Sequence, residues 1–129
     1  MANYSKQREE IIETIKLLNN YPTAEEIYFT TKQKDPAVSR STVYRNLNML
    51  VKNKVLTQIS ISNDPSRYEY SKNKKNQGYV VCVKCKKIYN FDYNFGTLKD
   101  DIYRQYGVEI FENGIVIKGI CKSCKEASN

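Results

Sequence analysis

The sequence contains no histidine and no tryptophan, and its 129 residues include only five glycines and three prolines. Histidine is the commonest general base of enzymes and a frequent ligand in metal sensors, so its absence excludes imidazole chemistry. The chain also lacks a glycine-rich phosphate loop and any pairing of acidic residues with a nucleophile. We therefore expect a protein that is not an enzyme and has no small-molecule substrate.

Long hydrophobic runs are missing as well. No apolar stretch approaches the roughly 20 residues that a membrane-spanning helix requires, and residues 1–6 lack the apolar segment of a signal peptide. Hydrophobic residues make up 40% of the chain and charged residues 27%, which is typical of a folded globular protein. We expect a cytoplasmic protein with no membrane partner.

The four cysteines form two Cys-x-x-Cys pairs, Cys82 with Cys85 and Cys121 with Cys124. Two such pairs supply the four thiolates of a closed tetrahedral zinc site, which predicts one structural zinc ion per chain. A reducing cytosol favours zinc over disulfides. Two other functions stay open for these pairs. One is a redox sensor acting through thiolate oxidation and zinc release, and the other is a zinc-ribbon adaptor that binds a protein partner.

The charge balance is basic, with 21 lysines and arginines against 14 acidic residues and a formal net charge of +7. Such an excess is compatible with nucleic-acid binding but does not establish it. Several lysines lie directly beside the cysteine pairs, where they offset the negative charge of a four-thiolate zinc centre. They are Lys84, Lys86, Lys87, Lys122 and Lys125.

The first half of the chain has the pattern of three short helices followed by a hairpin. Ser5, Thr23 and Ser39 are candidate N-terminal caps. Apolar residues follow Ser5 at helical spacing, and Thr23 has a glutamate three residues later, as in a capping box. Alternating residues over 56–71 then predict a β-hairpin with its turn at 63–66.

The second half predicts a mixture of strands and one main helix. Residues 72–78 are polar, basic and without periodicity, so they are the best candidate for a linker. Strands are expected on both sides of the first cysteine pair, and a helix is expected over 97–106. Asn113-Gly114 is a two-residue turn signal between apolar runs at 108–111 and 115–117, which predicts a second hairpin.

The third helix carries the strongest functional signal. Val43, Leu47 and Leu50 fall on one face, which we expect to be buried. The other faces offer arginines for guanine edges or phosphates, hydroxyls for phosphates, and an aromatic ring for thymine methyl groups. These residues are Arg40, Ser41, Thr42, Tyr44, Arg45 and Asn48. The pattern predicts a helix that reads the major groove of double-stranded DNA, with an ordinary solvated surface helix as the alternative.

Five parts of the chain together resemble the ferric uptake regulator superfamily of bacterial transcription regulators. They are Ser5-Lys6-Gln7-Arg8, Pro22-Thr23-Ala24-Glu25-Glu26-Ile27-Tyr28, Ser41-Thr42-Val43-Tyr44-Arg45-Asn46-Leu47, Ser66-Arg67-Tyr68-Glu69-Tyr70 and the two cysteine pairs. Their order and spacing make the resemblance specific, and it spans nearly the whole chain. The pattern is most similar to the peroxide-regulator-like members.

The resemblance implies an α+β chain of two domains. A winged helix-turn-helix domain would occupy residues 1–71, a hinge 72–78, and a small α/β dimerisation domain with the zinc site 79–129. As in the family, a homodimer would bind a palindromic DNA operator, here as a repressor, with Lys6 and Arg8 reaching phosphates. In the family a metal at the hinge closes the two DNA-binding domains into a binding posture.

The chain departs from the family at this hinge, where sensing relatives use mostly histidine with aspartate or glutamate. The matching positions here are Tyr21, Glu69, Gln77, Tyr79 and Asn90, with a further position near Asn113. Only Glu69 is a good ligand for a hard cation, so we expect no functional regulatory metal. Our hypothesis is that hydrogen bonds made by these side chains replace the metal. Solvated side chains with no such role are the alternative.

Overall fold

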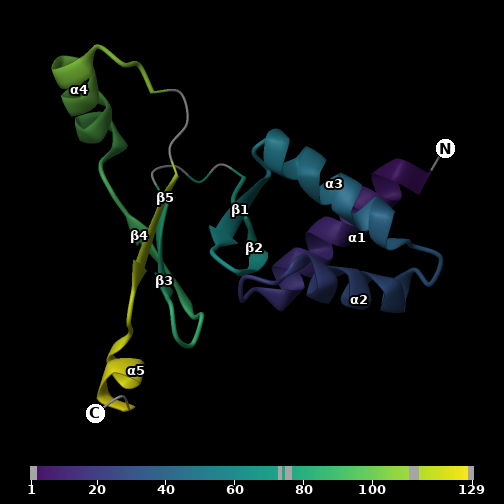
Figure 1. Ribbon diagram of the computed structural model, residues 1–129. Helices are drawn as coiled ribbons and strands as arrows, with labels where there is room; N and C mark the ends of the chain where they lie inside the picture. Colours follow the sequence, from purple (N-terminus) through teal and green to yellow (C-terminus); the bar gives the residue numbers. More distant parts are fainter. Residues whose placement is uncertain (1–2, 73, 75–76, 111–113, 128–129) are drawn as a thin grey trace. The chain divides into compact units, whose positions relative to one another are not determined.

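The computed structural model of the chain describes residues 3–72, 74, 77–110 and 114–127. The chain separates into two compact units, an N-terminal unit of Met1–Asn73 and a C-terminal unit of Lys74–Asn129. Both units combine helices with a small sheet (Figure 1). Among the described residues, no helix has the length and apolar character needed to cross a membrane.

The N-terminal unit begins with three helices, drawn in purple to blue in Figure 1. They are α1 (Asn3–Leu18), α2 (Ala24–Lys34) and α3 (Arg40–Lys52). The predicted capping box of α2 is confirmed, because the Thr23 hydroxyl accepts from the Glu26 amide and the Glu26 carboxylate accepts from the Thr23 amide. The predicted cap of α3 is confirmed too, since the Ser39 hydroxyl accepts from the Thr42 amide. These caps bind amides that would otherwise lack partners at the helix starts. The predicted cap at Ser5 is wrong, because α1 already begins at Asn3 and Ser5 lies inside the helix.

A two-stranded antiparallel sheet follows, made of β1 (Leu56–Ile61) and β2 (Asp64–Tyr70). The predicted hairpin is confirmed, but its turn is shorter than the expected 63–66. Asn63 adopts a positive φ of 63°, a conformation that asparagine tolerates better than most residues, and β2 starts at the next residue. Pro65 therefore lies inside a strand, which is acceptable because a two-stranded sheet has free edges.

One hydrophobic core joins the helices and the hairpin of this unit. The predicted inner face of α3 is confirmed, since Val43 and Leu47 are fully buried and Leu50 is nearly so. They pack with buried apolar residues of the other elements, which are Ile11, Ile15, Ala24, Ile27, Tyr28, Val38, Leu56 and Tyr68. Burying one face of α3 in this core leaves its opposite face toward solvent.

The C-terminal unit contains a three-stranded sheet of β3 (Gln77–Cys82), β4 (Ile88–Asp92) and β5 (Ile115–Gly119). The strand order is β4-β3-β5, with β4 antiparallel and β5 parallel to the central β3. Two helices complete the unit, α4 (Phe95–Tyr106) and α5 (Lys122–Ala127). The α4 helix ends at Gly107, whose φ of 69° is the left-handed conformation that glycine adopts without strain.

Two expectations for this half are wrong. The predicted linker ends too late, because Gln77 and Gly78 already belong to β3 and pair with Asp92 and Phe91 of β4. The predicted strand at 108–111 is not a strand over 108–110. An apolar pattern indicates that a segment can form a strand, but it does not indicate which strand it pairs with. Here β5 forms its hydrogen bonds with β3, which is distant in the sequence. Residues 111–113, including Asn113, lie outside the described residues.

Substitutions at the buried Leu47 and the exposed Asn48 distinguish the contribution of α3 to core packing from the contribution of its surface. We expect Leu47→Ala to lower the free energy of unfolding of the N-terminal unit by about 3 kcal/mol, because it empties space in a closed core. Asn48→Ala, a change at an exposed residue of the same helix, should alter it by less than about 0.5 kcal/mol. Chemical denaturation followed by circular dichroism measures both, and equal effects would contradict the assigned faces.

Candidate functional site

The four cysteines meet at one end of the C-terminal sheet. Because β5 runs parallel to β3, with Gly119 opposite Cys82, both strands finish at the same end of the sheet. Cys85 lies in the connection from β3 to β4, and Cys121 and Cys124 follow β5. The four sulfur atoms all lie within 4.8 Å of one another. The predicted grouping of the four cysteines is confirmed.

The sulfur positions fit an ion with tetrahedral coordination. Zinc–sulfur bonds of about 2.3 Å put neighbouring sulfurs about 3.8 Å apart, and the Sγ atoms of Cys85 and Cys121 are 3.8 Å apart. The backbone amide of Cys121 also donates to Cys82 Sγ at 3.4 Å. Amide donors of this kind stabilise a thiolate, and here they hold the Cys82 pKa at about 5, with the Cys121 amide as the main cause and Cys85 next.

The pKa of Cys124 is shifted in the opposite direction from that of Cys82. Its pKa is raised to about 12, first by hydrogen bonding with the Cys121 thiol and then by desolvation. Four thiols this close together cannot all ionise without a compensating cation. A divalent ion that binds thiolates supplies the missing charge, so the donor set fits zinc.

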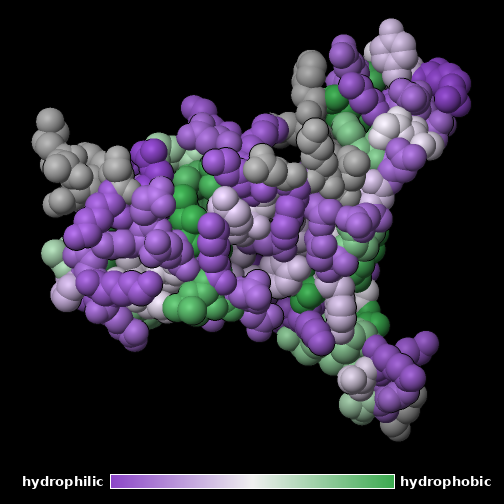
Figure 2. Space-filling view, turned by 180° about the vertical axis from the view of Figure 1, so that it is seen from behind, coloured by the Kyte–Doolittle hydropathy of each residue, from purple (hydrophilic) through white to green (hydrophobic). Residues whose placement is uncertain are grey.

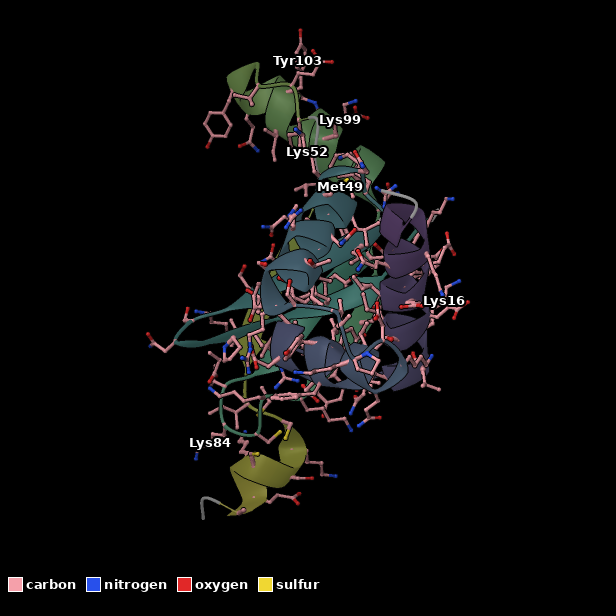
Figure 3. All side chains as sticks on the ribbon, turned by 90° about the vertical axis from the view of Figure 1, so that its right-hand side faces the viewer. Lys16, Met49, Lys52, Lys84, Lys99 and Tyr103 are labelled. Carbon is pink, nitrogen blue, oxygen red and sulfur yellow. The ribbon has the colours of Figure 1, made fainter. Side chains whose placement is uncertain are left out.

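The lysines around the cysteines are partly engaged with the protein. Lys86 donates from Nζ to the carbonyl of Val83 at 2.8 Å, and Lys87 lies over the ring of Tyr89. Lys84 is exposed and lies near α5 (Figure 3). These contacts keep positive charge close to the sulfur cluster.

Most of the predicted operator-contact residues lie on the solvent side of α3. Arg40, Ser41, Tyr44, Arg45 and Asn48 are exposed. Thr42 is half-buried and accepts a hydrogen bond from the Ser39 hydroxyl at 2.9 Å, while Ser41 Oγ lies 3.1 Å from the same hydroxyl. Ser41 and Thr42 therefore belong to the capping region at the start of α3.

Glu25, in the first turn of α2, holds two of these side chains. Its carboxylate accepts from Nε and Nη2 of Arg40 at 3.1–3.3 Å, and from the Tyr44 hydroxyl at 3.3 Å. The Arg40 hydrogen bonds lower the pKa of Glu25, while desolvation and then the Glu25 charge raise the pKa of Tyr44. Sequence reasoning missed Glu25, because its charge fits the start of α2 and nothing local links it to α3.

The two predicted phosphate contacts near the N-terminus differ in placement. Lys6 is exposed. Arg8 is half-buried and donates from Nη2 to the sulfur of Met49 at 3.6 Å, so its guanidinium lies against α3 (Met49 is labelled in Figure 3). Arg8 is therefore less accessible than expected.

Two of the expected hinge positions lie together in the N-terminal unit. The Tyr21 hydroxyl is hydrogen-bonded to the Glu69 carboxylate. Desolvation, followed by the charge of Glu69 and this hydrogen bond, raises the pKa of Tyr21 to about 12. Arg67 donates to the Tyr21 carbonyl at 3.1 Å, and the Tyr68 amide donates to the Pro22 carbonyl at 2.9 Å. The turn before α2 is thus attached to β2.

The remaining hinge positions lie on β3 and β4 in the C-terminal unit. Tyr79 is buried and pairs across the ladder with Asn90. The Gln77 amide donates to the Asp92 carboxylate, and the Asn90 amide donates to the Gly78 carbonyl at 3.3 Å. Among the described residues, only the four cysteines form a cluster of histidine, cysteine or acidic side chains suited to a metal.

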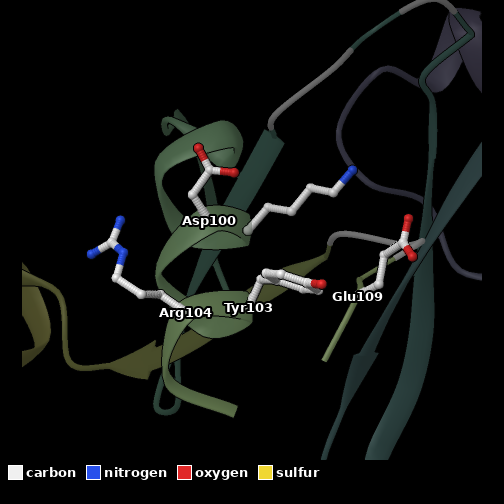
Figure 4. A pocket seen from close by; sticks show the side chains of 5 residues that line it. Asp100, Tyr103, Arg104 and Glu109 are labelled. Atoms are coloured by element: carbon white, nitrogen blue, oxygen red, sulfur yellow. The ribbon is translucent and has the colours of Figure 1, made fainter. Parts of the chain in front are cut away.

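A separate hollow lies beside α4 (Figure 4). It is lined by Lys99, Asp100, Tyr103, Arg104 and Glu109. Two cationic and two anionic side chains around one open hollow select no single class of charged ligand, so we assign it no binding role.

The model of the ferric uptake regulator family matches residues 2–118 of the chain. The chain belongs to the ferric uptake regulator family. The ferric uptake regulation protein of Helicobacter pylori (strain ATCC 700392 / 26695) is 30% identical over 124 residues, which cover 95% of this chain and 82% of that protein. The peroxide-responsive repressor PerR of Staphylococcus epidermidis is 28% identical over 95% of this chain and 81% of its own length.

Solved structures show the same fold. The Helicobacter pylori ferric uptake regulator, described as having three functional metal binding sites, superposes with a TM-score of 0.80 at 29% identity, covering 94% of this chain and 83% of that chain. The Campylobacter jejuni peroxide stress regulator superposes with a TM-score of 0.79 and supports the fold alone, since it is 23% identical over 95% of this chain and 92% of its own.

Membership of the ferric uptake regulator family makes the protein a transcription regulator of a family that binds metal and DNA. The resemblance seen in the sequence is thereby confirmed, and so is the mixed helix-and-sheet fold of the family. The cysteine cluster is the place in the described chain that can hold zinc.

The bond between Tyr21 and Glu69 makes a testable prediction without DNA. We expect the Tyr21 phenol to ionise at a pH near 12, and Glu69→Gln to lower this pKa toward the ordinary value of 10.0 by removing charge. Because the folded-state pKa is raised, the stabilisation from this group is complete below about pH 10 and is lost as the pH rises toward 12.

An ultraviolet difference titration of wild type against Tyr21→Phe isolates this phenol from the other ten tyrosines. Glu9→Gln, at an exposed residue of α1, is the matched control and should leave the curve unchanged. A Tyr21 titration that is the same with and without the Glu69 charge would contradict the assigned bond.

Proposed function

We propose that the protein is a sequence-specific DNA-binding repressor that binds palindromic operators as a homodimer, with one structural zinc ion per chain and no functional hinge metal. The observation that carries this proposal is the two-sided character of α3. Its apolar residues lie in the core, while Arg40, Tyr44, Arg45 and Asn48 are exposed together on its outer side.

Reading of the major groove requires a helix whose base-contacting side chains are free of the core. In this proposal the N-terminal unit is a winged helix-turn-helix domain. The α3 helix enters the groove, and the β1–β2 hairpin acts as the wing. Arg45 and Arg40 contact base edges or phosphates, Tyr44 contacts thymine methyl groups, and Lys6 contacts the backbone. Arg8 takes no part in this proposal because it is half-buried against Met49.

Dimer formation through the C-terminal unit is supported by its uncovered apolar residues. Within the described part of the chain, none of the α4 residues is buried. Tyr103, Tyr106, Val116, Ile117 and Ile120 are exposed, with Tyr106 at 74% and Ile117 at 47%. Figure 2 shows hydrophobic side chains at the surface of this unit. A second copy that covers this surface explains why a small unit would keep so many apolar residues outside.

The zinc ion is proposed to be structural. Among described residues of the C-terminal unit, the buried apolar side chains are Tyr79, Val81, Cys82 and Ile88, a set too small to stabilise the unit unaided. An ion held by Cys82, Cys85, Cys121 and Cys124 would tie the end of β5 to the connection between β3 and β4. Removing it should unfold the unit and dissolve the dimer.

Loss of the hinge metal is supported by the side chains found at the matching positions. Tyr21 and Glu69 bond to each other, while Gln77 and Asn90 bond to Asp92 and to the Gly78 carbonyl. Phenols and amides that already have protein partners are poor ligands for Fe(II), Mn(II) or Zn(II). Hydrogen bonds within each unit therefore take the place of ligands at these positions.

Operator selection from random double-stranded DNA with the purified dimer tests the function. We expect a palindromic site, and we expect Arg45→Ala to weaken binding to it by about 1–3 kcal/mol if Arg45 reads a base edge. If Arg45 contacts phosphate alone, the slope of log affinity against log salt should fall by about one unit instead.

Lys16→Ala is the matched control, because Lys16 is an exposed cation on α1 that the proposal places neither at the DNA nor at the dimer surface. It should leave the selected site and the affinity unchanged. A selection that yields no preferred sequence, together with a stable complex with another protein, would contradict the proposal and favour the zinc-ribbon adaptor.

Metal content gives a second test. We expect one tightly bound zinc ion per chain by elemental analysis and a loss of that ion in Cys121→Ser, because three thiolates close the site less well than four. When Fe(II), Mn(II) or Zn(II) is added to the zinc-loaded protein, no second metal ion per chain should bind tightly.

Glu69→Gln serves as the control, because it removes the sole carboxylate at the hinge positions and should leave the metal content unchanged. A second equivalent that tightens operator binding would refute the loss of the hinge metal. Early zinc release under mild peroxide, with a graded loss of DNA binding, would favour the redox sensor over a structural site.

A further inference from the structure

Arg40 of α3 is fixed from two directions. On one side the Glu25 carboxylate accepts from its Nε and Nη2 atoms, a pairing through one edge of the guanidinium. On the other side the guanidinium carbon lies 4.7 Å from the ring centroid of Tyr28 and 5.6 Å from that of Phe29. A long side chain with many rotamers is thus restricted to one direction.

The same carboxylate also fixes Tyr44, one helical turn further along α3. The Tyr44 hydroxyl donates to Glu25 Oε1, which also accepts from Arg40 Nε. Residues four apart share one side of a helix, so Glu25 binds two adjacent side chains of the outer surface of α3. The side chains of Arg40 and Glu25 are 56% and 46% exposed, so this arrangement lies at the surface.

A guanidinium has five N–H donors, and Glu25 occupies those of one edge. The outer edge, formed by Nη1 and the second N–H of Nη2, keeps the fork geometry that matches O6 and N7 of guanine. Holding one edge against a carboxylate therefore directs the other edge and lowers the entropy lost on binding.

We propose that Glu25 is a positioning residue that determines base preference, by presenting Arg40 and Tyr44 to the operator in one fixed arrangement. This inference rests on the proposed reading of DNA by α3. In this proposal Glu25 itself makes no contact with DNA. Glu25 acts through Arg40, which reads a guanine edge, and through Tyr44, whose ring packs against a neighbouring thymine methyl group.

A purely electrostatic effect of Glu25 predicts something different. A carboxylate near the DNA repels phosphates, so its removal would strengthen binding to every sequence equally and leave the base preference unchanged. Positioning predicts the reverse pattern, in which the preferred site is weakened while binding to random DNA is not. The two effects are separated by comparing specific with non-specific affinity for one variant.

The experiment repeats operator selection and affinity measurement with Glu25→Gln, a change of nearly the same shape that removes the charge. We expect the preference for the favoured base at the Arg40-contacted pair to fall about tenfold, with non-specific affinity unchanged or slightly raised. Glu13→Gln removes an equal charge from an exposed position of α1 and should change neither. Thermal unfolding of each variant confirms that the N-terminal unit stays folded.

A double-mutant cycle shows whether Glu25 acts through Arg40. In an Arg40→Ala background, Glu25→Gln should cause little further loss of base preference at that pair, because the positioned side chain is already gone. Tyr44→Phe keeps the ring but removes the hydroxyl held by Glu25. It should relax the preference at the adjacent base pair alone.

Three outcomes would overturn the inference. One is that Glu25→Gln keeps both the base preference and the affinity of wild type for the selected operator. Another is a uniform gain of affinity for all sequences, which would make Glu25 an electrostatic barrier. The third is additive losses in the cycle. If wild type itself selects no sequence, the proposed function fails and this inference fails with it, an outcome recognisable before any variant is tested.

Discussion

Burial of one face of α3 is the constraint on which the rest of the N-terminal unit depends. Val43 and Leu47 are held between α1, α2 and the hairpin, so the rotation of α3 about its own axis is fixed. That rotation decides which side chains reach solvent, and it also brings Arg40 and Tyr44 within reach of Glu25 on α2. Packing in the core and chemistry at the surface are therefore set by the same contacts.

The cysteine cluster and the positions matched to the family's hinge have different chemistry in this chain. Four sulfurs within 4.8 Å of one another cannot all ionise without a compensating cation, and here the pKa of Cys82 is lowered while that of Cys124 is raised. The hinge positions show the opposite situation, in which the phenol of Tyr21 already has Glu69 as its partner. A divalent cation would compensate the charge of four thiolates, whereas Tyr21 and Glu69 are joined to each other without one.

Local patterns in the sequence predicted much of the fold and of the site. The inner face of α3, the caps at Thr23 and Ser39, and the first hairpin follow from spacings of two to four residues, which are properties of a single helix, strand or turn. The grouping of the cysteines was predicted because two Cys-x-x-Cys pairs together complete one four-sulfur site. The missed features are tertiary. The β5 strand pairs with β3 rather than with the segment before it, and Glu25 meets Arg40 across 15 residues and two helices. No periodicity in the chain encodes either contact.

The parallel pairing of β3 with β5 has a consequence for the length of chain that the cysteine cluster closes into a loop. Cys82 and Cys121 are 39 residues apart, and α4 lies between them. Each cysteine pair can capture an ion by itself within a few residues, but a closed four-sulfur shell requires the intervening chain to form a loop first. An ion held by all four cysteines would therefore act as a cross-link between segments 39 residues apart, and losing it would return to the chain the conformational freedom of that loop.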